Sequence, residues 1–211
     1  MDRKRIFPSR PVDPCVDVPL SRIGAWAGIT GTMAFGLLWT AAVIADGSWA
    51  FGEDTLSELG RMDGGGRDIF NSAVILASIL WMIFTLGLYS ILQRRWSTRV
   101  GGALFFISAF SLLGIGIFPI DSGTPHTVAS WSFFIGALVS LLILALPVSQ
   151  TECFGRLGLV PTLVAPLISL SFLIWTTVPL AEAVAVMCLM AWAVIMSALI
   201  LLHVPRRKGL A

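Results

Sequence analysis

Long apolar stretches alternate with short polar segments along most of this 211-residue chain. The apolar stretches cover residues 23–45, 69–92, 100–120, 127–149, 157–178 and 183–202. A helix rises 1.5 Å per residue, so about 20 apolar residues cross the hydrocarbon core of a bilayer. Each stretch is continuously apolar rather than alternating, which excludes a membrane β-barrel. The pattern therefore predicts an all-α polytopic membrane protein, a bundle of six transmembrane helices.

The polar segments divide the chain into one membrane domain and two tails. We predict an irregular N-terminal tail over residues 1–22, a six-helix membrane domain over 23–203 and a basic tail over 204–211. The chain is 56% hydrophobic and 12% charged, against about 25% charged in soluble domains. Lipid is therefore the expected solvent for most of its surface.

Basic residues gather on the side of the membrane that holds both termini. Of the 14 lysines and arginines, all except Arg61 and Arg67 lie in the tails or in connections on that side. The positive-inside rule then predicts that the N-terminus and the C-terminus lie in the cytoplasm, and we expect the plasma membrane as the location. Since topology explains the basic clusters, we expect membrane lipids as partners, with other membrane subunits possible and no nucleic acid.

No ionisable residue falls inside the six predicted spans. Proton-coupled transporters, pumps and voltage sensors place such residues within their spans, so this pattern disfavours ion-coupled transport. The two histidines, His126 and His203, are predicted at opposite ends of the bundle, about 30 Å apart, and therefore do not share one haem iron. The sequence identifies no cofactor. The residues that could carry a function are therefore sought in the outer connections.

The longest connection, residues 46–68, holds six of the twelve acidic residues and predicts an ordered element over the outer end of the bundle. Its centre, EDTLSELG, has the pattern of a short helix. Thr55 and Glu58 have capping-box spacing, and we expect Gly60 to end the helix in the left-handed conformation.

Two outer connections supply the candidate site residues Asp54, Ser57, Glu58, Asp121 and His126. An Asp-His pair with a serine is the residue set of nucleophilic catalysis, with His126 as base, Asp121 orienting it and Ser57 as nucleophile or Glu58 as acid. The carboxylates of Asp54, Glu58 and Asp121 with His126 are also a ligand set for a divalent cation. The same residue types cap helices and form turns, so a purely structural role is the third interpretation.

Small residues recur every four positions on two predicted helices, as they do where membrane helices pack closely. They are Gly24, Gly28, Thr32 and Gly36 on the first helix, and Ser132, Gly136 and Ser140 on the fourth. We expect both rows to face neighbouring helices.

Three segments of the chain, DTLSELG, IFNSAVILAS and GIFPIDSGTPHTVASWSFFIGAL, resemble the domain-of-unknown-function 998 family of prokaryotic membrane proteins. The resemblance covers roughly residues 20–203. It implies a compact six-helix membrane protein with shared polar residues on its outer face, here Ser57, Glu58, Asp121 and His126. The family supplies no activity. The SELG and IFN segments are also distantly similar to DRAM-type and FRAG-type six-span proteins, some of which are associated with lipid remodelling, and this favours lipid over soluble ligands.

Three hypotheses of function follow, and the sequence leaves open whether the protein is an enzyme. In the first, the polar outer face binds a lipid head group, an ion or a partner protein. In the second, the protein is an outer-face lipid hydrolase or transferase that uses Asp121 and His126 with Ser57 or Glu58. In the third, it is an accessory subunit of a larger membrane complex.

Overall fold

The computed structural model describes residues 19–203, and within them the chain forms six long helices and two short 3₁₀ turns. The elements are α1 (Pro19–Asp46), η1 (Leu56–Gly60), α2 (Arg67–Ile91), α3 (Trp96–Ile117), η2 (Ile120–Ser122), α4 (Thr124–Ser149), α5 (Gly155–Trp175) and α6 (Val178–His203). All six α-helices are long and apolar enough to cross a membrane. This confirms the predicted all-α bundle.

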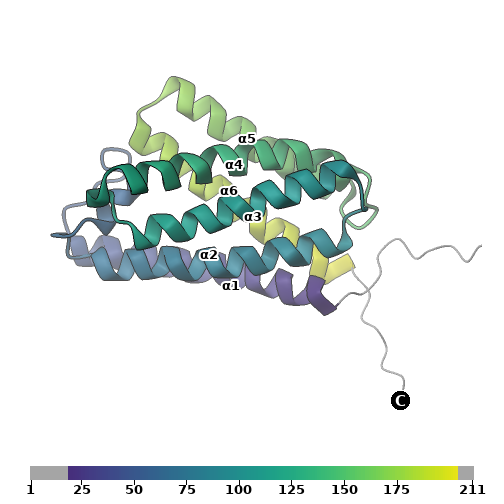
Figure 1. Cartoon of the computed structure of the whole chain (residues 1–211), viewed down its shortest axis with the longest axis horizontal. Coiled ribbons are helices and arrows are strands. Elements are labelled where there is room, and N and C mark those ends of the chain that lie inside the picture. Colours follow the sequence, from purple (N-terminus) through teal and green to yellow (C-terminus); the bar gives the residue numbers. More distant parts are fainter. Residues whose placement is uncertain (1–18, 204–211) are drawn as a thin grey trace, which may run out of the picture.

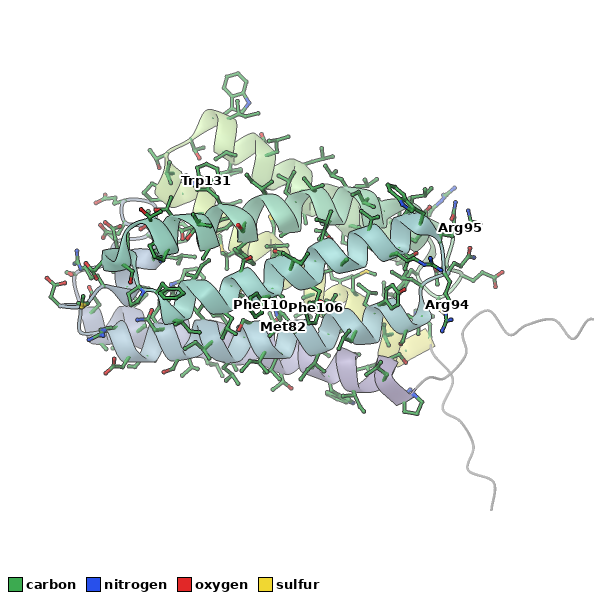
Figure 2. All side chains as sticks on the ribbon, viewed as in Figure 1. Met82, Arg94, Arg95, Phe106, Phe110 and Trp131 are labelled. Atoms are coloured by element: carbon green, nitrogen blue, oxygen red, sulfur yellow. The ribbon has the colours of Figure 1, made fainter. Side chains whose placement is uncertain are left out.

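The helices form a closed ring in which each packs against the next along the chain and α6 packs against α1 (Figure 1). The connections 47–66 and 118–123 lie at one end, on the left of Figure 1, which we call the cap end. The start of α1 and the end of α6 lie at the opposite end, the tail end. In Figure 2, Arg94 and Arg95 project from the tail end, while Trp131 lies toward the cap end.

Glycines bring α1 and α2 into backbone contact. A Cβ atom added to Gly24 would lie 2.6 Å from the Cα of Gly87, so neither position has room for a side chain. A Cβ at Gly28 would lie 2.4 Å from the Ser197 hydroxyl of α6. The small residues of α1 therefore face neighbouring helices, as predicted. On α4, Ser140 donates to the Gly101 carbonyl of α3 at 2.8 Å, but Ser132 is exposed, so the predicted row is only partly an interface.

Aromatic rings fill the middle of the bundle. The Trp192 ring packs edge-on against Phe84 and Phe105, with centroids 5.6 and 5.1 Å apart. Its indole N–H donates to the Thr162 hydroxyl at 2.9 Å, which satisfies the one polar atom of the ring. These contacts join α2, α3, α5 and α6 at one level.

Helix α5 is the least enclosed of the six. It packs only against α4 and α6 among the long helices of the described chain, and its C-terminal half leans away from the bundle (Figure 1). The apolar side chains there, among them Leu167, Ile174 and Trp175, are exposed. This half of α5 presents apolar surface to lipid on more than one side.

The structure corrects two predicted helix boundaries. Helix α1 begins at Pro19, so the last residues assigned to the N-terminal tail are helical, while residues 1–18 and the tail 204–211 lie outside the described residues. Helix α6 begins at Val178, which places Glu182 in its second turn. Glu182 lies just outside the predicted span 183–202, near the start of the longer helix.

Candidate functional site: the cap

The connections 47–66 and 118–123, which we call the cap, fold onto the end of the bundle. The segment η1 is its buried part, because Leu56 and Leu59 are only 3% and 0% exposed. It lies against α1, α2, α6 and η2. Burial of two leucines fixes η1 on the bundle, as the hydrophobic effect contributes about 1.5–3 kcal/mol for each fully buried leucine.

The acidic residues around η1 bind the backbone of the cap itself. Glu58 accepts hydrogen bonds from the amide and the hydroxyl of Thr55, which confirms the predicted capping box. Asp54 accepts from the Ala50 amide at 2.8 Å. The Trp49 indole donates to the Thr55 carbonyl at 2.8 Å. Both carboxylates satisfy amides that would otherwise lack a partner.

Gly60 has a different role from the one predicted. It is not among the glycines with positive φ, so the expected left-handed helix end is wrong. Instead, the Asn71 side chain of α2 donates to the Gly60 carbonyl at 3.1 Å. A Cβ on Gly60 would lie 2.4 Å from the Asn71 amide oxygen. Glycine is favoured here because a larger residue would crowd the Asn71 side chain.

Asp121 and His126 stabilise the second connection of the cap. The Asp121 carboxylate accepts from the Met62 amide at 2.7 Å and so joins the two connections. His126 lies in the first turn of α4, as predicted, and is 7% exposed. Its Nδ1 lies 2.8 Å from the Phe118 carbonyl oxygen. Since a carbonyl only accepts, Nδ1 carries the proton and donates.

Ser57 pairs with a residue that the sequence analysis missed. Its hydroxyl donates to Glu182 of α6 at 3.2 Å, and the Leu56 amide donates to the other carboxylate oxygen at 3.2 Å. Glu182 was missed because the predicted span began at the next residue. The apolar run in fact continues on its N-terminal side from Val178, and a helix drawn through the whole run would have included it.

The candidate residues make separate contacts in the described part of the chain. Within residues 19–203, no hydrogen bond joins His126 to Ser57 or to Asp121. The same part of the chain holds no group of three His, Cys, Asp or Glu side chains placed to hold a metal ion. The side chains of Asp54, Glu58, Asp121 and His126 are each hydrogen-bonded to a backbone group of the cap. The arrangement holds the cap in place, and a catalytic or metal-binding role for these residues stays a prediction.

Six apolar helices closed by a polar cap define an integral membrane protein. A family model described as "protein of unknown function (DUF998)" matches residues 29–199, and the chain belongs to this family. The match includes η1, Asn71 and the Asp121–His126 turn, the segments on which the resemblance was based. No curated protein and no solved structure matches the chain. The more distant similarity to DRAM-type and FRAG-type proteins stays a prediction.

Proposed function

We propose that this protein is a non-catalytic membrane protein whose cap binds the polar head group of a membrane lipid. The observation that carries the proposal is which groups the polar side chains of the cap bind. Asp54, Glu58, Asp121 and His126 bind backbone groups, and these hydrogen bonds support an ordered surface. Because the six apolar helices end at the cap, this surface would lie at the level of the lipid head groups.

The distribution of basic residues supports one orientation for this proposal. Arg94 and Arg95 lie at the tail end, where both described termini also lie (Figure 2). By the positive-inside rule the tail end would face the cytoplasm and the cap the outer side of the plasma membrane. Lipids of the outer leaflet would then be the ligands.

A lipid hydrolase or transferase is the second candidate, and one observation favours it. The Ser57 hydroxyl donates to a carboxylate, which is the contact a base makes with a hydroxyl nucleophile. Here the carboxylate of Glu182 would replace His126 as the base. Against this candidate, Ser57 is only 8% exposed beneath the cap surface.

An accessory subunit is the third candidate. The exposed C-terminal half of α5 would be the surface that another chain covers. Copurification of the full chain with a second membrane protein, lost on polar substitution of Leu167 and Ile174, would favour this candidate over lipid alone.

One experiment tests the first two candidates, because it measures lipid binding and lipid turnover in the same preparation. The full chain, purified in mild detergent, is analysed by native mass spectrometry with added lipids, and the lipids are recovered and profiled. We expect saturable adducts and unchanged lipids. The variants Asp121→Asn and His126→Ala should lower thermal stability without altering the lipid profile. Turnover that disappears in Ser57→Ala, with stability retained, would establish the hydrolase instead.

A further inference from the structure

Three aromatic rings form a continuous wall on one side of the cap. The Trp49 ring stands nearly perpendicular to Trp39 of α1 and to Phe51, at interplanar angles of 82° and 76°. The centroid distances are 6.1 and 6.3 Å. Trp39 and Trp49 are half-buried against the core, while Phe51 is 52% exposed. We call these three residues the aromatic wall.

The aromatic wall spans the boundary between the cap and the helices. Trp39 lies seven residues before the end of α1, about 10 Å below the cap at the rise of a helix. At the other end of the wall, the Thr177 hydroxyl donates to the Gly52 carbonyl, next to Phe51, at 3.4 Å. The wall therefore stands beside the α5–α6 turn, where a lipid head group would lie above its own acyl chains.

The cap end carries many acidic residues. Its carboxyl groups, apart from that of Glu182 on α6, belong to Asp46, Glu53, Asp54, Glu58, Asp63, Asp68 and Asp121. Among the described residues 19–203, the basic side chains at this end are Arg61 and Arg67, and each has its Nε within 4 Å of an aspartate one or two positions further on. An excess of carboxylates attracts cations and repels anionic head groups.

Two of these carboxylates accept hydrogen bonds from backbone amides in or next to the aromatic wall. Asp46 accepts from the Trp49 amide at 3.0 Å, and Asp54 accepts from the Ala50 amide at 2.8 Å. Aromatic faces and nearby carboxylates together are the chemistry that recognises ammonium groups, because both place negative potential toward the cation. An anionic head group would meet repulsion from the same atoms.

We propose that the aromatic wall selects lipids whose head group carries an ammonium ion, such as phosphatidylethanolamine or phosphatidylcholine. This inference rests on the proposed function and names its ligand class. The ammonium lies against Trp49 and Phe51, near the carboxylates of Asp46 and Asp54 that accept from the Trp49 and Ala50 amides. The acyl chains extend along α1 and the exposed half of α5.

Head-group preference of the full chain provides the test. Delipidated protein in detergent is titrated with phosphatidylethanolamine, phosphatidylcholine or phosphatidylglycerol, and adducts are counted by native mass spectrometry. We expect about tenfold tighter binding of the two ammonium lipids, since a desolvated cation–π contact and nearby charge together reach this size. Phe51→Leu keeps the apolar bulk but removes the aromatic face, and should reduce the preference about threefold.

Phe118→Leu is the matched control, because Phe118 is also an exposed aromatic of the cap but lies outside the wall. It should leave the preference unchanged. Equal loss in both variants, or equal affinity for all three lipids, would overturn the inference while lipid binding itself survives. Absence of any saturable adduct would overturn the proposed function as well. Competition by soluble phosphocholine at the same concentration as lipid would show that the acyl chains add nothing to binding, and this would overturn the assignment of a lipid as the ligand.

Discussion

The contact between α1 and α2 and the contact between the cap and the bundle are held together by different forces. Gly24 and Gly87 meet backbone to backbone, with no side chain between them. In the cap, side chains such as Asp121 and Asn71 reach the backbone of another segment. Inside a helix the backbone groups are already paired, so close packing supplies the attraction between membrane helices. The irregular cap has unpaired amides and carbonyls, which need partners.

The difference predicts opposite sensitivities for the two regions. The contact between α1 and α2 should tolerate a change of polarity in nearby side chains. It should not tolerate an increase in volume at the glycines. The cap should depend on the donors and acceptors that hold it. The following substitutions test this comparison, from the largest expected effect to the smallest.

Gly24→Ala should have the largest effect on stability. The new Cβ would lie 2.6 Å from the Cα of Gly87, and backbone atoms have no rotamer by which to move away. We expect a loss of about 3 kcal/mol, measured as a lower thermal midpoint in detergent. Gly36→Ala is the control, because its Cβ would meet only the flexible end of Met190 at 3.4 Å. Equal destabilisation by both substitutions would contradict the backbone contact.

Glu182→Ala should release the cap from α6. The Ser57 hydroxyl and the Leu56 amide would lose their acceptor, at a cost of about 2 kcal/mol. Trypsin should then cut faster after Arg61, which lies in the cap beyond η1. Glu182→Gln keeps an acceptor oxygen and should be cut more slowly than the alanine variant. If all three proteins were cut at one rate, Glu182 would not anchor the cap.

Gly60→Ala and Asn71→Ala should not be additive. Each alone should cost about 1 kcal/mol, the first by crowding the Asn71 oxygen and the second by removing a hydrogen bond to Gly60. In the double variant the crowded side chain is absent, so the loss should be smaller than the sum by about 0.5 kcal/mol or more. Thermal unfolding of the four proteins gives this coupling, and strict additivity would rule out the direct contact.

Asp63→Asn should have the smallest effect. The Asp63 carboxylate lies 3.7 Å from the Arg61 Nε, and its side chain is 88% exposed. Exposed ion pairs contribute little because water and salt screen them. The thermal midpoint should stay unchanged, whereas a clear decrease would show that surface charge also holds the cap.

The parts of this protein that follow local rules were predictable. Six helices follow from apolar length, and the Thr55–Glu58 capping box follows from a spacing of three residues. The interface role of Gly24 followed from its place in a row of small residues. The pairing of Glu182 with Ser57 was not predictable, because the two residues lie 125 positions apart and no local pattern relates them.

The sequence by itself determined the class of protein, because hydrophobicity and helix length are additive along the chain and need no knowledge of neighbours. It also supplied the residues of the cap and the family to which the chain belongs. Only the tertiary structure decided what those residues do: that Gly60 makes room for Asn71, that Ser57 meets Glu182 rather than His126, and that Trp39 joins Trp49 and Phe51. Ser57 and Glu182 lie 125 residues apart, and the other contacts depend on how the connection after α1 folds back onto the helices, so none of them follows from local sequence rules.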